Sequence, residues 1–229
     1  MIQLVFAVAV SYLIGSILGS LLLGRLTGRV DIRTVGSGNP GSTNALRTQG
    51  KLFALGVIVI DVGKGWIAAG VLPALVSHAA LASHVTLASP AAPAPQELRA
   101  WLPAACGAAV MLGHVYPLWY GFRGGKAVAT FVGAVLGLAP VLLIAVLAMW
   151  LGVVILSGFV ALASMAAAAV LPIAVAWRGG AGHLPLLAFG IFAVTIIVFA
   201  HRSNIARMQA GSEPRARRLW LLGRTGSRP

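Results

Sequence analysis

Residues 140–177 read PVLLIAVLAMWLGVVILSGFVALASMAAAAVLPIAVAW and contain no charged side chain. A helix that spans a bilayer needs about 20 consecutive, predominantly apolar residues. The Ser-Gly pair at residues 157–158 divides this run into two pieces of nearly that length. The run therefore predicts two consecutive membrane helices, over residues 140–156 and 159–177.

The whole chain shares this apolar character. Of its 229 residues, 59% are hydrophobic and 9% are charged, and the mean hydropathy is +0.94. A soluble domain usually carries about 25% charged residues. We therefore predict an all-α integral membrane protein with about seven transmembrane helices. The other five apolar segments are residues 3–24, 52–76, 101–119, 126–138 and 185–200.

The positions of the basic residues predict the orientation. Residues 1–24 carry no charge, lack the basic start of a signal peptide, and are followed by Arg25 and Arg29. Because loops on the cytoplasmic side carry an excess of Lys and Arg, we expect the N-terminus outside and the C-terminus in the cytosol. With seven helices, fourteen of the 17 Lys and Arg residues then lie on the cytosolic side.

The chain is expected to form one polytopic domain over residues 1–213, followed by a basic cytosolic tail over residues 214–229. Residues 77–98 are rich in Ser, Ala and Pro and predict a loop on the outer side without chemistry. The net charge of +13 is attributed to contacts with lipid headgroups. Nucleic acid is not expected as a partner, because the basic residues are scattered along an apolar body.

Few residues are available for metal or acid–base chemistry. A single Cys106 excludes an internal disulfide, and four acidic residues are too few for a carboxylate-rich metal site, so no cofactor is expected. The sequence contains neither a G-x-S-x-G motif nor the H-x-x-x-x-D motif of many acyl-CoA acyltransferases. After these exclusions, the expected site is a pocket rich in hydrogen-bond donors and cations, which suits phosphorylated substrates. The acidic residues are Asp31, Asp61, Glu97 and Glu213.

The first polar segment, residues 31–51, reads DIRTVGSGNPGSTNALRTQGK. Its glycines predict a backbone with positive φ that turns successive N–H groups toward one anion. Arg47 would add a planar guanidinium suited to phosphate. A glycine-rich turn with solvated side chains is the alternative interpretation. The glycines are Gly36, Gly38 and Gly41, and the short side-chain donors are Ser37, Asn39, Ser42, Thr43 and Asn44.

A helix is expected to follow this loop, with Ser42 or Thr43 as its N-cap. Its N-terminus would then also face the anion. The segment is not a P-loop, because the G-x-x-x-x-G-K-[ST] spacing is absent.

The second polar segment, residues 113–130, reads GHVYPLWYGFRGGKAVAT. Arg123 and Lys126 flank Gly124 and Gly125 at a predicted helix start, where backbone N–H groups and both cations could surround a phosphate. A basic pair at the membrane edge is the alternative. His114, upstream on the incoming helix, is interpreted as structural.

The third polar segment, residues 201–213, reads HRSNIARMQAGSE. His201 and Asn204 share a helix face if the helix continues, and Arg202 and Arg207 lie close by. Glu213 is expected to pair with an arginine and order the segment. The alternative is an interfacial basic helix end.

Asp61 and Lys64 lie within the predicted helix 52–76, where ionisable residues are costly and usually paired. Their i, i+3 spacing predicts a structural ion pair, and a role in shaping the site is the second interpretation.

Four segments in this order, GSGNPGSTNALR, DVGKG, GHVYPLWYGFRGGKAVAT and HRSNIARMQAGSE, closely resemble the signature segments of the bacterial acyl-phosphate:glycerol-3-phosphate acyltransferases, the PlsY family. The resemblance implies a seven-helix enzyme of the bacterial inner membrane with its site facing the cytosol. Such an enzyme transfers a fatty acyl group from acyl phosphate to the 1-hydroxyl of glycerol 3-phosphate, giving lysophosphatidic acid and phosphate in phospholipid biosynthesis. The expected enzyme is compatible with a monomeric state. A transporter of a phosphorylated metabolite, the competing class, would show discontinuous helices as well.

The resemblance and the donor pattern together give a set of expected site residues. Catalytic roles are expected for Ser37, Lys126, His201 and Asn204. The family site also includes a serine between the fifth and sixth helices, for which Ser164 is expected and Ser157 is the alternative. Ala127 stands where the family usually has glycine. Other departures are Arg123 in place of Lys, Phe159 in place of Tyr, and Ala161 in place of Ser. Substrate contacts are expected for Gly36, Gly38, Asn39, Gly41, Thr43, Asn44, Arg47, Arg123, Gly124, Gly125, Ser164 and Arg202.

Overall fold

The computed structural model describes residues 2–28, 31–77, 96–179 and 183–222 and divides the chain into two compact units, residues 1–138 and 139–229. The described residues are helical, with turns and loops between the helices and no strand among them. The predicted loop over residues 77–98 lies outside the described residues except for Ser77 and residues 96–98. Each unit is described by itself, and the predicted single domain stays a prediction.

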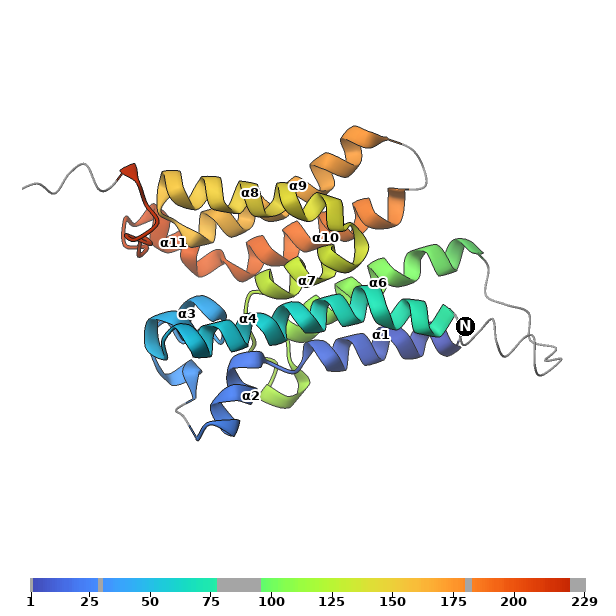
Figure 1. The fold of residues 1–229 in the computed structure, drawn as a ribbon, viewed down its shortest axis with the longest axis horizontal. Helices are drawn as coiled ribbons and strands as arrows, with labels where there is room; N and C mark the ends of the chain where they lie inside the picture. Colours follow the sequence, from blue (N-terminus) through green and yellow to red (C-terminus); the bar gives the residue numbers. More distant parts are fainter. Residues whose placement is uncertain (1, 29–30, 78–95, 180–182, 223–229) are drawn as a thin grey trace, which may run out of the picture. The chain divides into compact units, whose positions relative to one another are not determined.

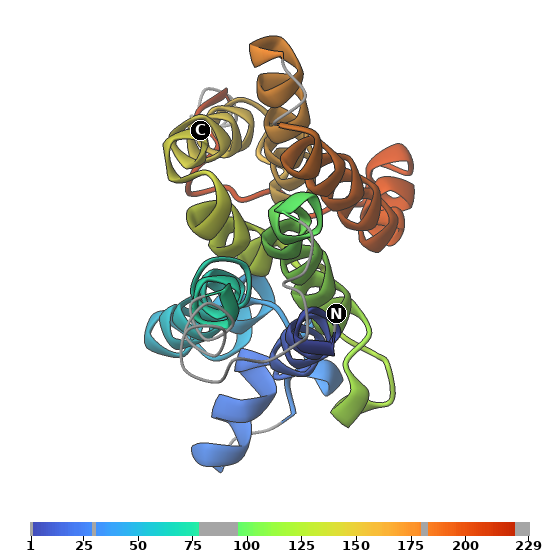
Figure 2. The same ribbon diagram turned by 90° about the vertical axis from the view of Figure 1, so that its right-hand side faces the viewer.

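The first unit packs its long helices in pairs: α1 lies along α6, α4 lies along α7, and α2 and α3 both contact α4 (Figures 1 and 2). Glycines allow this close approach. A Cβ on Gly15 would overlap the carbonyl oxygen of Val110, and a Cβ on Gly133 would overlap that of Val62. The elements are α1 (Ile2–Gly15), α2 (Gly19–Leu26), η1 (Ile32–Thr34), α3 (Ser42–Thr48), α4 (Lys51–Trp66), η2 (Ile67–Val71), α6 (Gln96–Val115), η3 (Leu118–Tyr120) and α7 (Val128–Leu138).

The first predicted helix, residues 3–24, is wrong as a continuous element. It is broken after Gly15, and α1 and α2 are bent by 55° at the break. The predicted segment 126–138 is also shorter, because α7 has 11 residues. At 1.5 Å per residue, α7 is about 16 Å long, about half of the hydrocarbon core.

Within the described residues, four helical spans are long and apolar enough to cross a membrane, or six if each bent pair counts as one span. This agrees with the predicted all-α membrane class, although the short α7 does not add a full span of its own. The four spans are Lys51–Ser77, Gln96–Tyr120, Pro140–Ser157 and Val160–Arg178.

The second unit begins with the two helices predicted from residues 140–177. Their observed bounds differ from the predicted ones by at most one residue, and Gly158 turns between them with a φ of 75°. α10 packs on α9 and bends by 57° into α11. The elements are α8 (Pro140–Ser157), α9 (Val160–Arg178), α10 (Leu184–Ala200) and α11 (Arg202–Gln209).

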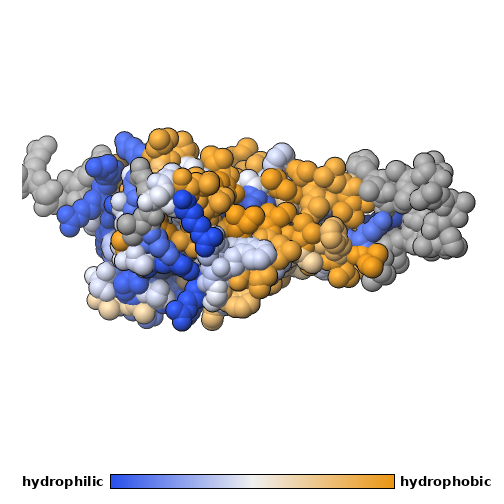
Figure 3. All heavy atoms as spheres, turned by 90° about the horizontal axis from the view of Figure 1, so that it is seen from below, coloured by the Kyte–Doolittle hydropathy of each residue, from blue (hydrophilic) through white to orange (hydrophobic). Residues whose placement is uncertain are grey.

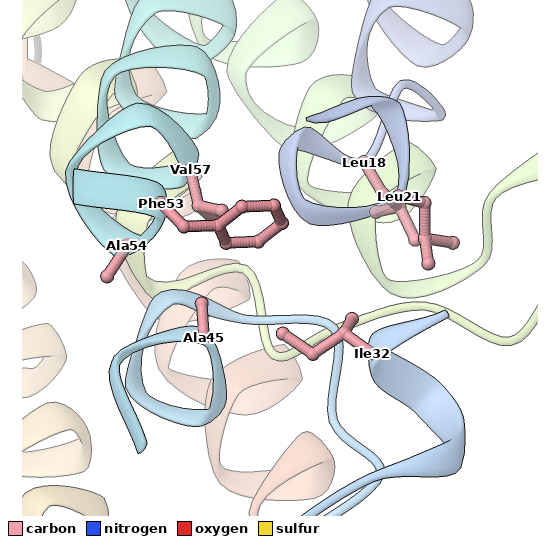
Figure 4. Close-up of a cluster of buried hydrophobic side chains, with 7 residues drawn as sticks. All are labelled: Leu18, Leu21, Ile32, Ala45, Phe53, Ala54 and Val57. Atoms are coloured by element: carbon pink, nitrogen blue, oxygen red, sulfur yellow. The ribbon is translucent and has the colours of Figure 1, made fainter. Parts of the chain in front are cut away.

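A cluster of buried apolar side chains holds the polar end of the first unit together (Figure 4). Phe53 of α4 points toward Leu18 and Leu21, which flank the start of α2. The cluster therefore anchors η1 and α3, the elements on either side of the glycine-rich loop, to α4. Its buried members are Leu18, Leu21, Ile32, Ala45, Phe53, Ala54 and Val57.

Hydrophilic side chains of the first unit gather at the end where α2 and α3 lie, as Figure 3 shows, while hydrophobic side chains cover the middle of this face. This distribution is that of a membrane unit with one end in contact with water.

Candidate active site

An open pocket of about 460 Å³ lies in the first unit, between the first two polar segments. Gly38 lines it from the first segment, and Arg123 and Gly124 line it from the second. The structure therefore brings together two loops that the sequence separates by more than 80 residues. The complete lining is Asp31, Arg33, Thr34, Gly38, Pro40, Arg123 and Gly124.

The glycine-rich loop follows the predicted backbone at two of its three glycines. Gly36 and Gly38 have φ values of 60° and 70°, where a side chain would be strained. Gly41 has a φ of −111° and is itself the N-cap of α3, so its predicted positive φ is wrong. The predicted Ser42 or Thr43 cap is wrong as well, because α3 begins at Ser42 and shows no side-chain cap.

The buried Asn44 side chain stabilises the loop through hydrogen bonds to its backbone. Its side-chain amide donates to the carbonyl oxygens of Ile32 at 3.1 Å and Val35 at 3.0 Å, and its Oδ1 accepts from the backbone N–H of Ser37 at 3.0 Å. Both amide protons are therefore used inside the loop, so Asn44 does not act as the predicted donor to a ligand.

The other predicted residues of the first segment lie on the loop surface or on α3. The Ser37 and Arg47 residues are exposed, and Asn39 and Thr43 are half-buried. None of these four lines the pocket.

An ion pair beside the pocket was not singled out from the sequence. Asp31 caps η1 through the backbone N–H of Arg33 at 2.9 Å and accepts from Nη2 of the same arginine at 2.6 Å. This side-chain hydrogen bond lowers the pKa of Asp31 and raises the pKa of Arg33, so both stay charged. The Asp-x-Arg spacing is the signal that could have revealed the pair, since Asp often binds the N–H two residues on.

The guanidinium groups of Arg25 and Arg33 both lie over the ring of Tyr120, at 5.2 Å and 5.7 Å from its centre. Stacking on an aromatic ring fixes the plane of an arginine, and the N–H edge of Arg33 is held by the Asp31 carboxylate. Tyr120 thus attaches η3 to the basic side of the pocket.

The second segment departs from its predicted role in one respect. The N–H groups of Gly124 and Gly125 donate to the carbonyl oxygens of Val115 at 3.1 Å and His114 at 3.0 Å. They are therefore occupied at the end of α6 and do not surround a phosphate as predicted.

The charged side chains of the second segment still fit the predicted site. Arg123 is exposed at the pocket and Lys126 is half-buried. The predicted helix start at residue 126 moves to Val128. Before it, Ala127 has a φ of 57°, a conformation that favours glycine, which the resemblance implies at this position.

Asp61 and Lys64 form the predicted ion pair, 2.9 Å apart and buried, with side chains 1% and 5% exposed. Their other partners explain the break in the first helix. Asp61 accepts from the backbone N–H of Gly19 at 3.2 Å. Lys64 donates to the carbonyl oxygens of Gly15 at 3.1 Å and Ile17 at 2.7 Å.

A helix end leaves N–H or C=O groups without partners, and a broken helix has two such ends. The Lys64 ammonium lies at the negative end of α1, and the Asp61 carboxylate lies at the positive end of α2. The charged pair therefore supplies hydrogen-bond partners to both helix ends at the break, and the helix ends in turn supply partners to the buried charges.

The same buried group is connected to both loops of the pocket. Nδ1 of His114 lies 2.8 Å from Nζ of Lys64, and the carbonyl of His114 accepts from Gly125. From the other side of the break, the Ser20 hydroxyl donates to the carbonyl of Pro40 at 2.8 Å. The structural role expected for His114 is thus supported, and Ser20 is a positioning residue that the sequence did not reveal.

The third polar segment lies in the second unit and is ordered as predicted by Glu213. This carboxylate accepts from the Asn204 amide at 2.6 Å and pairs with Arg207 at 2.7 Å. His201 is buried, and its Nδ1 donates to the carbonyl of Ile197 at 2.8 Å. Arg202 stacks over Phe199 at 4.6 Å.

Ser164 and its alternative Ser157 also lie in the second unit. The Ser164 hydroxyl is buried, donates to the carbonyl of Val160 at 2.8 Å and accepts from the Trp150 indole at 3.3 Å. Ser157 donates to Val153 at 2.7 Å. That these serines and the third segment share one site with the pocket stays a prediction, because the two units are described separately.

The family profile "Glycerol-3-phosphate acyltransferase" matches residues 5–211. A glycerol-3-phosphate acyltransferase of Synechococcus sp. (strain CC9902) is 39% identical over 207 residues, covering 90% of this chain and 92% of the relative. One of Sinorhizobium medicae (strain WSM419) is 37% identical over 206 residues, covering 89% and 88%.

Two solved structures are similar to this chain. The crystal structure of PlsY (YgiH), an integral membrane glycerol 3-phosphate acyltransferase, in its glycerol 3-phosphate form superposes with a TM-score of 0.75 at 32% identity. Its lysophosphatidic acid form superposes with a TM-score of 0.74 at 31% identity. Each comparison covers 93% of this chain and 94% of the solved one. The chain is thus an integral membrane protein that belongs to the glycerol-3-phosphate acyltransferase family.

Proposed function

We propose that this chain transfers a fatty acyl group from acyl phosphate to the 1-hydroxyl of glycerol 3-phosphate, releasing lysophosphatidic acid and phosphate. The observation that carries the proposal is the pocket of the first unit, where Arg33 and Arg123 meet the glycine-rich loop. Membership of the family supports glycerol 3-phosphate as the acceptor. The absence of an H-x-x-x-x-D motif from the sequence supports a donor other than acyl-CoA.

The proposed reaction needs no acyl-enzyme, because an acyl phosphate is already activated. The hydroxyl oxygen of glycerol 3-phosphate attacks the acyl carbon and forms the ester bond. The bond between that carbon and the phosphate oxygen breaks, and phosphate leaves with the electron pair. The leaving phosphate takes the proton of the hydroxyl, and His201 orients this phosphate. Positioning and electrostatic stabilisation supply most of the acceleration.

Charge neutralisation is the main task of the protein in this reaction. Both substrates carry a phosphate, and two anions held close together repel each other strongly where water is excluded. Arg33 and Arg123 at the pocket, with Arg47 and Lys126 on the adjoining segments, offset this repulsion. Ser37, on the exposed loop, would contact glycerol 3-phosphate.

Phosphate release by the purified protein in detergent tests the activity. We expect lysophosphatidic acid and phosphate to form from acyl phosphate and glycerol 3-phosphate, and no product to form from acyl-CoA. Lys126→Gln should lower kcat/KM by about 100-fold or more, in the range of a lost charged contact to the transition state. Lys51→Gln, which removes an exposed lysine at the start of α4, is the matched control and should retain activity. Product formation from acyl-CoA alone would contradict the proposed donor.

A trapped acyl group on any serine would contradict the direct attack. Mass spectrometry of the protein after acid quenching, with acyl phosphate but without acceptor, should show only the unmodified chain.

We propose the bacterial inner membrane as the location, with the N-terminus outside and the pocket facing the cytosol. The distribution of Lys and Arg supports this orientation. Labelling of intact cells with a membrane-impermeant maleimide tests it. A cysteine replacing Ile2 should react and one replacing Thr34 should not, while the native Cys106 is buried and gives the background. The reverse pattern would invert the topology.

The two bent spans would also fit a transporter of a phosphorylated metabolite. Uptake of glycerol 3-phosphate into sealed proteoliposomes without an acyl donor separates the two functions. We expect no uptake above protein-free vesicles.

A further inference from the structure

We infer that residues 214–222 form an interfacial clasp that binds the anionic lipid headgroups of the surrounding membrane. This segment follows the part of the chain that matches the family, residues 5–211. The contacts that hold this segment all lie within the second unit.

The segment is fastened to the turn between α8 and α9 (Figure 1). The backbone N–H of Ala216 donates to the carbonyl of Gly158 at 2.8 Å, and that of Leu221 donates to the carbonyl of Ile155 at 3.1 Å. The indole of Trp220 donates to the carbonyl of Leu156 at 3.2 Å. The predicted tail is therefore a packed element over its described residues.

These bonds close the C-terminal end of α8. The last carbonyl groups of a helix have no partner within the helix. Here the backbone N–H of Gly158 donates to the carbonyl of Val154. The carbonyls of Ile155 and Leu156 accept hydrogen bonds from the clasp. The Arg215 guanidinium stacks on the rings of Phe159 and Trp220, at 4.5 Å and 4.1 Å from their centres. A cation near this end is also favoured by the helix dipole.

The turn that holds the clasp belongs at a membrane surface. α8 and α9 have 18 and 19 residues, so each is about 27–29 Å long, close to the thickness of the hydrocarbon core. Two consecutive helices of this length place their short connection in the headgroup region. A tryptophan beside that connection lies where aromatic residues anchor membrane proteins.

The exposed side chains of the clasp suit this location. Leu219, Leu221 and Leu222 are 43%, 53% and 62% exposed, and Leu156 at the end of α8, whose carbonyl accepts from Trp220, is exposed too. Arg215 and Arg217, which precede these leucines in the chain, are exposed as well. Apolar side chains next to arginines are the composition of segments that lie in the interface of an anionic bilayer, and a stacked guanidinium keeps its N–H edge for a lipid phosphate.

Spin-label depth measurements test the clasp in the full chain. Leu221→Cys keeps the backbone bond to Ile155 and carries a nitroxide, and the native chain with its buried Cys106 gives the labelling background. In bilayers of phosphatidylcholine with increasing phosphatidylglycerol, we expect the label to become more accessible to oxygen and less accessible to a water-soluble nickel chelate. A label that stays fully accessible to the chelate at every lipid composition would overturn the inference.

The double substitution Arg215→Gln and Arg217→Gln tests the chemistry. Each cation near an anionic surface is expected to favour the bound state about fivefold, so the pair should weaken the response to phosphatidylglycerol about 30-fold. Arg99→Gln, a basic residue on α6 in the first unit, is the matched control and should leave the response unchanged. If inorganic phosphate in pure phosphatidylcholine produces the same change, the ligand is a soluble phosphate and the assignment to lipid is wrong.

Discussion

Two ion pairs of the first unit, Asp61–Lys64 and Asp31–Arg33, are similar in length but differ in their surroundings. Lys64 and Asp61 lie 2.9 Å apart with side chains 5% and 1% exposed, whereas Arg33 and Asp31 lie 2.6 Å apart with side chains 35% and 37% exposed. The first pair closes the two ends of a broken helix, and the second borders the pocket. The comparison shows that burial and further partners, rather than the distance between charges, decide what an ion pair does.

The buried pair cannot lose one member without leaving the other uncompensated. Desolvated charges are costly, and removing one partner leaves that cost without its compensation. The exposed pair is screened by water and contributes about 0.2–1 kcal/mol in typical cases. Stability should therefore depend on the Asp61–Lys64 pair, while the Asp31–Arg33 pair can respond to a bound phosphate.

The largest effect is expected from Lys64→Met. It removes the partner of Asp61 and the donor to the carbonyls of Gly15 and Ile17, so the free energy of unfolding should fall by about 3–5 kcal/mol. Thermal unfolding in detergent measures the loss. Lys51→Met, an exposed lysine at the start of the same helix, should change it little. Equal effects of the two substitutions would show that the buried pair is not a structural centre.

The double variant Asp61→Leu with Lys64→Met separates stability from positioning. Removing both charges restores part of the stability lost in the single variant, because no unpaired charge remains. The carbonyls of Gly15 and Ile17 and the N–H of Gly19 still lack partners, so the break and the pocket loops shift. We expect kcat/KM for glycerol 3-phosphate to stay at least about tenfold below that of the native chain. Full recovery of activity together with stability would contradict the positioning role.

The sequence was sufficient to predict α8, α9 and the Asp61–Lys64 pair, because length, hydropathy and i, i+3 spacing are local properties. It could not predict the break after Gly15, because that break depends on charges from α4, more than 40 residues away. The same limit applies to Asn44 and to Gly124 and Gly125. Their donors were expected to face a ligand but are used by carbonyls of the protein, and only the three-dimensional structure shows which partner a donor has.

An intermediate effect on stability is expected from Ser20→Ala. Ser20 lies on α2 and contacts the pocket loop. The substitution removes the hydrogen bond from α2 to the carbonyl of Pro40 in the pocket and should cost about 1 kcal/mol of stability. The released loop should raise KM for glycerol 3-phosphate more than it lowers kcat. Thr27→Ala is the matched control, because the Thr27 hydroxyl donates to the carbonyl of Leu23 within α2 and Thr27 does not line the pocket. A change in stability without a change in KM would show that the Pro40 contact does not position the pocket.

The smallest effect on stability is expected from Asp31→Asn. Asn can still cap η1, and the exposed pair contributes about 0.2–1 kcal/mol in typical cases. Because the folded pKa of Asp31 is lowered, the contribution of the pair is present above the usual carboxyl pKa of about 3.9 and is lost as the pH falls through the folded value. The stability difference between the native chain and Asp31→Asn should therefore vanish in strong acid.

Activity should respond to Asp31→Asn in the opposite sense to stability. The substitution removes a negative charge from the lining of the pocket, so Arg33 becomes available to a phosphate and KM for glycerol 3-phosphate should fall, by about fivefold at most. Steady-state kinetics at neutral pH measure this, with Glu97→Gln on α6 as the control for removing a carboxylate outside the pocket. A rise in KM would mean that Asp31 is needed to hold Arg33 in place. The exposed pair would then resemble the buried one in function, and burial would set only the energetic cost of breaking it.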